Sequence, residues 1–289
     1  MTEPSRRDVI RCAAGASALG IAGALALPPY ALAGSPRETG YYRYRIGDVR
    51  CTALYDGIWR KTHADDFIRN ASVDATRDSL AKGGLTPAHV TIEFTQTLLE
   101  TGGKRVLIDP GTGGQWVDTA GSMPGNMAAA GFSPRDIDTI LISHFHPDHI
   151  FGLMDRNTDA QIFPDSEIVV PAVEYDFWTD PQVFSMLPKP WHGLAQRIQA
   201  TFPKWPNVKR VADDVEVAPG IRSLSAPGHT AGHTAYHVSS GKTELIVAGD
   251  VAITPALFVA NPGWHIVFDA DPELAETTRR RLFDRIVAD

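Results

Sequence analysis

Alternating and uniformly apolar segments, separated by turns rich in glycine and proline, dominate the chain from position 41 onward. Alternation is typical of a strand with one buried face, and an unbroken apolar run is typical of a strand buried on both faces. Thr101-Gly102-Gly103-Lys104 is a hairpin signal between two such segments. The pattern predicts strands at 42–46, 49–55, 90–100, 105–108, 139–143, 221–224, 244–248 and 266–268.

Two segments carry helix signals. Ser133-Pro134-Arg135-Asp136 combines an N-cap serine, a proline at the first helical position and an acidic side chain in the first turn. A final helix is predicted from Asp271 through Ile286. Residues 155–210 are less regular, and we expect most of their aromatic side chains to fill a satellite core under long loops. The order of strands and helices predicts a layered α/β architecture.

Three histidines and one aspartate follow the apolar run 139–143, in the segment His144-Phe145-His146-Pro147-Asp148-His149. Imidazole and carboxylate groups are the ligands that zinc and other borderline divalent metals prefer. His144 and His146 project from the same side of an extended segment, whereas Asp148 and His149 point elsewhere. The cluster predicts two adjacent metal sites, and the alternative is a solvated polar loop.

Later segments offer further candidate ligands. Asp250 follows an apolar strand, and a carboxylate that leaves a buried strand is costly unless it is paired or coordinated. His229 lies between Gly228 and Gly232, which allow the backbone to approach an ion closely. Asp109 ends another strand, where the residues alone leave a turn-forming role and a metal-supporting role equally open.

The motif His-x-His-x-Asp-His at 144–149 resembles that of the metallo-β-lactamase superfamily. The rest of the family's pattern is matched in order by Ile108-Asp109-Pro110-Gly111, by Pro227-Gly228-His229-Thr230-Ala231-Gly232-His233-Thr234 and by Ala248-Gly249-Asp250. Other segments resemble the branch of methyl parathion hydrolase and related esterases and lactonases, namely Gly40-Tyr41-Tyr42-Arg43, Tyr55-Asp56-Gly57, Glu174-Tyr175-Asp176-Phe177-Trp178 and Phe268-Asp269-Ala270-Asp271.

The resemblance implies an α/β fold, a four-layer αβ/βα sandwich that here lacks its last C-terminal strand. It implies two Zn²⁺ ions, the first held by His144, His146 and His229, and the second by Asp148, His149 and a bridging Asp250.

The resemblance also implies roles for residues around the ions. Asp148 and Asp250 are the candidate catalytic residues, Asp109 would orient a metal-bound histidine from outside the ligand shell, and Trp178 would line the substrate pocket. The family has a further histidine ligand after the final helix, which this sequence lacks. The second ion therefore has an incomplete ligand set, and we expect the chain to be incomplete at its C-terminus.

The activity implied is that of a zinc-dependent metallohydrolase, in which hydroxide bound by two zinc ions cleaves small phosphotriesters, esters or lactones. The sequence has no Gly-x-Ser-x-Gly segment that would supply a serine nucleophile instead. The glutamate of flavodiiron proteins is replaced by His146, which argues against that class. Four alternatives stay open: an N-acyl homoserine lactonase that quenches quorum sensing, a thioesterase, a persulfide dioxygenase, and an inactive truncated metal-binding domain.

Composition excludes some partners. The net charge of −7 and the pI near 5.8 argue against a nucleic-acid surface, which requires a basic patch. We interpret the one basic triplet of the final helix, Arg279-Arg280-Arg281, as a solvated helix face. The two cysteines, Cys12 and Cys51, exclude a thiolate zinc site and predict no disulfide in the mature protein.

The N-terminus has the features of an export signal. Arg6 and Arg7 precede an apolar stretch from Cys12 to Leu27, which ends in two prolines and the small-residue sequence Ala31-Leu32-Ala33. We expect residues 1–33 to be a twin-arginine-type signal peptide and residues 34–289 to be the hydrolase domain. The mature protein would then be periplasmic or secreted, without a membrane anchor. The family resemblance also allows a homodimer.

Overall fold

The computed structural model describes residues 40–288. The predicted signal peptide at 1–33 lies outside the described residues, so its export function stays a prediction. Within residues 40–288, the helices are too short or too polar to cross a membrane.

The larger sheet has seven strands in sequential order. Its strands are β1 (Tyr41–Ile46), β2 (Val49–Lys61), β3 (Val90–Thr101), β4 (Lys104–Ile108), β5 (Thr139–Leu141), β6 (Glu167–Pro171) and β7 (Val208–Val211). The first four strands pair antiparallel, and β4 to β7 pair parallel. Parallel neighbours require crossover connections, so the loops that follow β5 and β6 lie at the same edge of the sheet.

The smaller sheet has four antiparallel strands in the order β11, β10, β9, β8. Their bounds are β8 (Glu216–Ala218), β9 (Ile221–Ser225), β10 (Thr234–Ser240) and β11 (Thr243–Val247). The inward faces of the two sheets meet in one apolar core that includes Leu99 and Ile108 from the larger sheet and Tyr236 and Val238 from the smaller.

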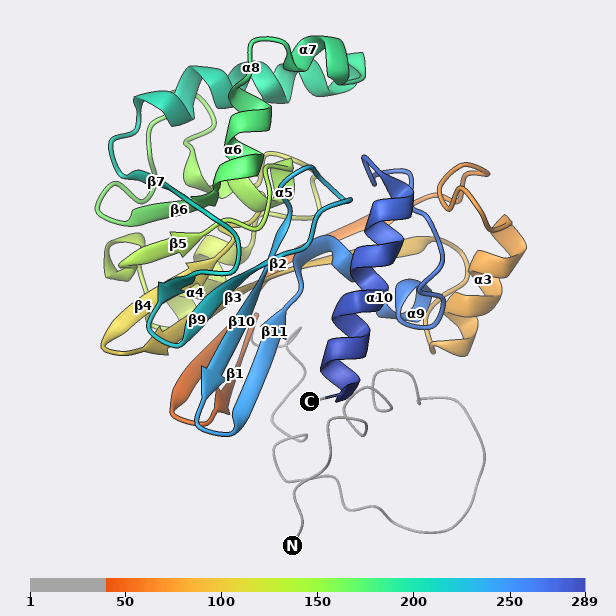
Figure 1. Cartoon of the computed structure of the whole chain (residues 1–289), viewed down its shortest axis with the longest axis horizontal. Coiled ribbons are helices and arrows are strands. Elements are labelled where there is room, and N and C mark those ends of the chain that lie inside the picture. The colour runs from red at the N-terminus through yellow and green to blue at the C-terminus, as the bar shows by residue number, and fades with distance from the viewer. Residues whose placement is uncertain (1–39, 289) are drawn as a thin grey trace, which may run out of the picture.

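Helices cover the outer face of each sheet (Figure 1). The larger sheet packs against α4 (Met123–Ala129), α6 (Ala172–Thr179) and α8 (His192–Thr201) through a second apolar core. The smaller sheet packs against Leu282 of α10 (Pro272–Ala288). Two further helices, α3 (Val73–Lys82) and α9 (Pro255–Phe258), form a satellite core with the start of β3. The predicted four-layer αβ/βα sandwich is confirmed.

Several predicted elements differ in detail. The strand predicted at 49–55 continues to Lys61 through an irregularity between Tyr55 and Gly57. The helix predicted at Ser133 is a single 3₁₀ turn, Pro134–Asp136. The strand predicted at 266–268 is reduced to one isolated bridge between Ile266 and Ile68. Residues 155–210 are more regular than predicted, because α6, α7 (Val183–Met186) and α8 lie there.

The interpretation of the basic triplet was wrong for its first residue. Arg279 is 1% exposed, and its guanidinium donates hydrogen bonds to the backbone carbonyls of Val251, Pro262 and Trp264. Its neighbours Arg280 and Arg281 are exposed, as expected. Sequence periodicity alone missed this because α10 lies against the loop after β11 on the face that carries Arg279.

Candidate metal centre

All six predicted metal ligands come from segments that follow or connect strands. His144 and His146 lie in the turn after β5, and Asp148 and His149 lie in α5 (Pro147–Ile150) directly behind it. His229 belongs to the loop between β9 and β10, and Asp250 to the short 3₁₀ helix η6 (Gly249–Ala252) after β11. Pro147 is the first residue of α5, where its fixed φ angle suits the start of a helix.

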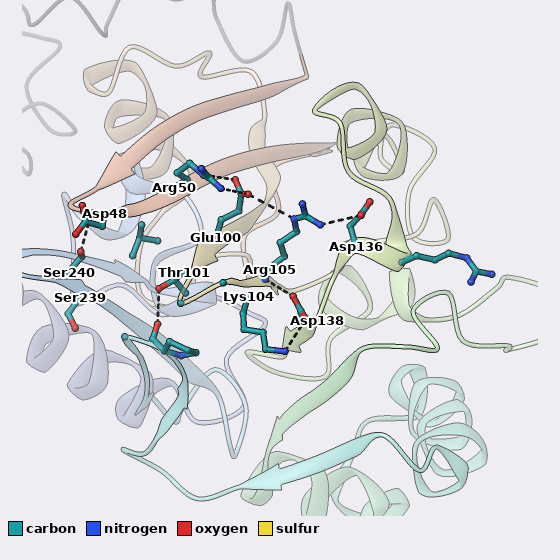
Figure 2. Close-up of a pocket in the computed structure, with 16 residues that line it drawn as sticks. Asp48, Arg50, Glu100, Thr101, Lys104, Arg105, Asp136, Asp138, Ser239 and Ser240 are labelled. Atoms are coloured by element: carbon teal, nitrogen blue, oxygen red, sulfur yellow. Dashed lines mark hydrogen bonds and ion pairs between the residues drawn. The ribbon is translucent and has the colours of Figure 1, made fainter.

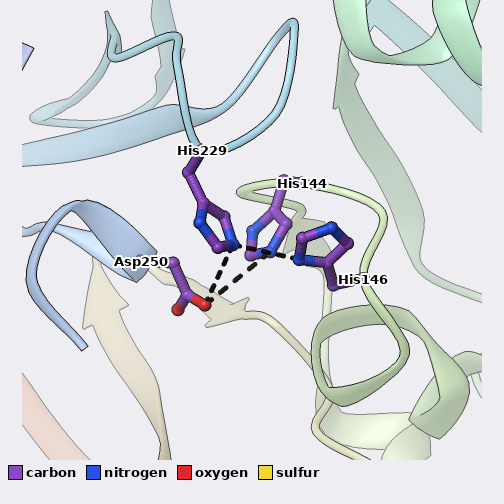
Figure 3. Close-up of side chains that lie close together, drawn as sticks. All are labelled: His144, His146, His229 and Asp250. Carbon is purple, nitrogen blue, oxygen red and sulfur yellow. Dashed lines mark hydrogen bonds and ion pairs between the residues drawn. The ribbon is translucent and has the colours of Figure 1, made fainter. Parts of the chain in front are cut away.

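The first ligand group consists of His144, His146, His229 and Asp250 (Figure 3). One potential ligand atom from each lies within 4.8 Å of the others. Nδ1 of His146 is 3.0 Å from Nε2 of His229, which is 3.2 Å from Oδ2 of Asp250. Nε2 of His144 is buried and has no hydrogen-bond partner. An unpartnered buried nitrogen in this donor set fits a divalent metal ion of the zinc type.

The second group consists of Asp148, His149 and Asp250. Nε2 of His149 is 3.4 Å from Oδ2 of Asp148 and 3.2 Å from Oδ1 of Asp250. The two carboxylate oxygens of Asp250 therefore face different groups. A cavity of about 150 Å³ opens beside this second group, between β3 and β11. The donor set of the second group also fits a divalent ion. It offers three protein ligands from the described residues, whereas the first group offers four.

Asp109 supports both groups from outside the ligand set. Its φ of 56° is in the left-handed region, and its carboxylate accepts hydrogen bonds from the backbone N–H and the hydroxyl of Ser143. Nδ1 of His149 lies 2.8 Å from Oδ2 of Asp109. The Ser143 hydroxyl lies 3.0 Å from Nδ1 of His144. These contacts orient both imidazoles, as a carboxylate behind a metal-bound histidine does.

Asp269 supports His229 in the same way, and the sequence reasoning did not assign it this role. Nδ1 of His229 lies 2.9 Å from Oδ1 of Asp269, which is 2% exposed. The buried guanidinium of Arg279 is 3.6 Å from the other carboxylate oxygen of Asp269. The only available signal was the segment 268–271, which resembles the hydrolase branch but does not identify the partner histidine.

Burial and charge set the protonation of the histidines. Burial lowers the pKa of His144 and of His146 well below the usual range, so both imidazoles are neutral and able to coordinate a metal. Burial also lowers the pKa of His229, but hydrogen bonds with Asp250 and Asp269 outweigh it and raise the pKa to about 9. His233 accepts a hydrogen bond from the backbone N–H of Asp250.

An aromatic cavity of about 130 Å³ opens directly onto both groups. Its wall includes four of the candidate ligands, His146, Asp148, His229 and Asp250. The remaining wall is apolar and largely aromatic, with Trp59, Ile92, Phe94, Trp116, Pro147, Trp191, Ile253 and Phe268. The apolar part of the wall carries no charge, so it fits an uncharged, apolar group.

Trp178 lies beside this cavity rather than in its wall. It is 2% exposed, belongs to the core between the larger sheet and its helices, and donates a hydrogen bond from Nε1 to Glu174. Trp191 packs between Trp178 and the cavity, with its ring stacked on His146 at 4.7 Å. The predicted substrate contact of Trp178 is therefore not supported by the cavity lining. Trp191, which the sequence reasoning did not single out, takes that place.

A larger, open hollow of about 840 Å³ lies far from the candidate ligands, between the hairpin turns of the two sheets (Figure 2). Its four cationic side chains are each paired with a carboxylate, namely Arg50 with Glu100, Lys104 with Asp138, Arg105 with Asp136, and Arg135 with Asp165. Each cationic group of the hollow therefore already faces a carboxylate.

Comparison with known proteins agrees with this fold and ligand arrangement. The family model described as the metallo-β-lactamase superfamily matches residues 95–287. The chain belongs to that superfamily. A curated N-acyl homoserine lactonase from Bacillus thuringiensis is 27% identical over 156 residues, which are 53% of this chain and 52% of the lactonase. The β-lactamase-like protein 2 homolog of Drosophila melanogaster is 25% identical over 202 residues, 66% of this chain and 60% of the homolog. The chain thus spans about half the length of the curated lactonases it matches.

Solved structures share the fold over most of the chain. AidC, described as a dizinc quorum-quenching lactonase in complex with a product, superimposes with a TM-score of 0.79 at 24% identity and covers 85% of this chain and 86% of AidC. The hydrolase AbOPH, of the β-lactamase superfamily, superimposes with a TM-score of 0.76 at 28% identity, with the same coverage of 85% and 86%. Membership in the methyl parathion hydrolase branch stays a prediction.

Proposed function

We propose that this protein is a metal-dependent hydrolase of small, uncharged lactones, esters or phosphotriesters, with two Zn²⁺ ions in the two ligand groups. The observation that carries the proposal is the aromatic cavity that opens onto both groups and whose wall, apart from the candidate ligands, is apolar and uncharged. Zinc ions bound there would supply Lewis acidity and water activated near neutral pH. The resemblance to AidC and to the curated lactonases supports lactones as the first substrates to test.

Different residues around the aromatic cavity would bind the substrate and transfer the proton. Trp59, Trp116 and Phe268 form a contiguous aromatic surface, with ring centroids 5.9 and 5.8 Å apart in the two pairs that share Trp59. This surface would bind the apolar substituent of the substrate and exclude water from it. Asp148, whose carboxylate faces both cavities, would accept or return a proton at the leaving group.

The test compares matched substrates on the purified, metal-loaded chain. A 4-methylphenyl ester and a 4-carboxyphenyl ester of the same acid place a neutral and an anionic substituent in the aromatic cavity, and each rate is divided by the rate of uncatalysed hydrolysis of the same ester to correct for leaving-group reactivity. We expect kcat/KM to be about 100-fold lower for the charged ester, because an unpaired charge in an apolar wall costs about 3 kcal/mol. Equal values for the two esters would contradict the proposed binding mode.

The same assay separates the alternative activities. N-acyl homoserine lactones, phosphotriesters and thioesters are supplied as parallel substrates, with and without a chelator. Hydrolysis of thioesters alone would replace the proposal with a thioesterase. A persulfide is supplied in a separate reaction, and its oxidation with dioxygen in the iron-loaded protein would indicate the persulfide dioxygenase class. No turnover with any substrate would support an inactive metal-binding domain. We also propose that the protein is exported to the periplasm and that it assembles as a homodimer.

A further inference from the structure

Glu174 is a buried carboxylate that the proposed chemistry does not use. It lies in the first turn of α6 and is 0% exposed. Four donors reach it: the backbone N–H of Phe145, the indole of Trp178, the hydroxyl of Thr230 and the backbone N–H of Gly232. A carboxylate has about four lone-pair positions, so this one is fully satisfied and has none left for a metal ion.

The two oxygens of Glu174 hold two different metal-binding loops. Oε1 accepts from the N–H of Phe145 at 2.9 Å, and Phe145 lies between His144 and His146. Oε2 accepts from the Thr230 hydroxyl at 2.7 Å and from the Gly232 N–H at 2.9 Å, directly after His229. One carboxylate therefore connects the loops that carry the three histidines of the first group.

The backbone around these hydrogen bonds leaves little freedom. A Cβ atom at Gly232 would lie 2.2 Å from the backbone nitrogen of Glu174. On the other side of His229, a Cβ atom at Gly228 would lie 2.2 Å from the backbone nitrogen of Ala275 in α10. The His229 loop thus packs closely between the N-terminal turns of α6 and α10. Its position relative to His144 and His146 depends on the hydrogen bonds that Glu174 accepts from both loops.

We propose that Glu174 is a positioning residue that sets the distance between the two loops and thereby the affinity and coordination geometry of the first metal site. This inference rests on the proposed metal binding but not on the substrate. Glu174 acts through hydrogen bonds to the backbone and to Thr230, without contact with an ion or with a reacting atom.

The test measures metal binding by the full chain, independently of turnover. Glu174→Gln keeps the shape of the side chain but places an NH₂ group opposite donors, so one loop loses its anchor. We expect the affinity of the first ligand group for Zn²⁺, measured by competition with a chelator, to fall about 10–100-fold. The visible absorption spectrum of the Co²⁺-loaded protein should also change, because it reports ligand geometry. Equal affinity and an unchanged spectrum would overturn the inference.

Two further variants separate positioning from general loss of stability. Thr230→Val removes one hydrogen bond between Glu174 and the His229 loop, and it should weaken Zn²⁺ binding and alter the Co²⁺ spectrum even where Glu174→Gln does not fold. Ser166→Ala removes a buried hydroxyl hydrogen bond to the Ile137 carbonyl, at the opposite end of β6. If Ser166→Ala and Thr230→Val lower the melting temperature equally and also weaken metal binding equally, Glu174 acts only through overall stability and the inference is wrong.

If the wild-type chain binds neither Zn²⁺ nor Co²⁺, the inference fails together with the proposed metal site. If the wild type binds Zn²⁺ but hydrolyses no substrate, only the proposed function fails.

Discussion

The two ligand groups share Asp250 but differ in how firmly the protein holds them. In the first group, His144, His146 and His229 are at most 8% exposed, and Asp269 and Ser143 fix the ring orientations of two of them. The second group has three ligands among the described residues, and two of them, Asp148 and Asp250, have side chains that are 16% and 17% exposed. Asp109 supports its single histidine.

This difference separates a pre-organised site from a partly formed one. Ligands whose rotamers are fixed by packing and by outer hydrogen bonds lose little entropy when they bind an ion, and they bind it more tightly. We therefore expect stepwise metal binding, with the first group filled at lower metal concentration than the second.

The most disruptive change removes the residue common to both groups. Asp250→Ala deletes the carboxylate that faces His229 on one side and His149 on the other. We expect both ions to be lost from the purified protein and hydrolysis to fall at least about 1000-fold, since the ions contribute several kcal/mol to catalysis. Elemental analysis and the ester assay measure the two effects. Asp165→Ala, at an exposed position, is the control and should change neither. Retention of wild-type turnover by Asp250→Ala would refute the assignment.

Single-ligand variants address the two groups separately. His144→Ala should abolish the tighter binding step in a zinc titration, and His149→Ala should abolish only the weaker step. The stoichiometry after dialysis should differ accordingly, with more zinc retained by His149→Ala. If both variants lose the same step, the two groups form one site and the comparison fails.

Replacement of Asp269 or Asp109, which hydrogen-bond to the candidate histidine ligands, tests the difference in affinity between the two groups with a smaller effect. Asp269→Asn should lower the affinity of the tighter site about 10–100-fold, and Asp109→Asn should lower that of the weaker site by a similar factor. In the metal-free protein, the pKa of His229 is about 9, against an ordinary histidine value near 6.5. Asp269→Asn removes the negative charge of one of the two carboxylates that raise this pKa, so the pKa of His229 should fall, as NMR titration would detect. An unchanged His229 pKa would mean that Asp250 alone raises it.

The smallest effect is expected outside the ligand groups. Trp116 is 38% exposed at the rim of the aromatic cavity, so Trp116→Ala should raise KM for aryl esters about 3–10-fold and leave zinc content unchanged. Trp178→Ala, in the core, should instead lower stability by about 3–5 kcal/mol. The two variants are compared by thermal unfolding and steady-state kinetics. A larger KM effect in Trp178→Ala than in Trp116→Ala would place substrate next to Trp178 after all.

Local sequence was sufficient to group the candidate ligands at 144–149, and the family resemblance added His229, Asp250 and the supporting Asp109, but neither identified the supports Asp269 and Glu174. His144 to His149 are contiguous, and their grouping follows from a strand that ends in a turn. Asp269 and Glu174 reach the histidine loops only through tertiary contacts, and no spacing along the chain relates Asp269 to His229. The burial of Arg279 was missed for the same reason, since its acceptors are carbonyl groups in a loop far from α10 in sequence.

Strand prediction succeeded both for the long alternating segment that became β3 and for the shorter apolar segments that became β4 and β9. It failed where tertiary contacts determine the backbone path. Residues 266–268 have a similar composition, but the backbone there turns toward α10 and pairs with Ile68 only at Ile266. The side-chain directions of Trp178 and Trp191 depend on the helices of residues 172–201, which the sequence pattern did not reveal.

The shared carboxylate of Asp250 couples the two binding equilibria. An ion in the first group changes the affinity of the second group by some factor. An ion in the second group must change the affinity of the first group by the same factor, because linkage is reciprocal. An ion that draws one oxygen of Asp250 into place also orders the second oxygen, which favours cooperative loading, whereas repulsion between two dications opposes it. The sign of this coupling determines whether partly loaded molecules accumulate when the metal supply is limited.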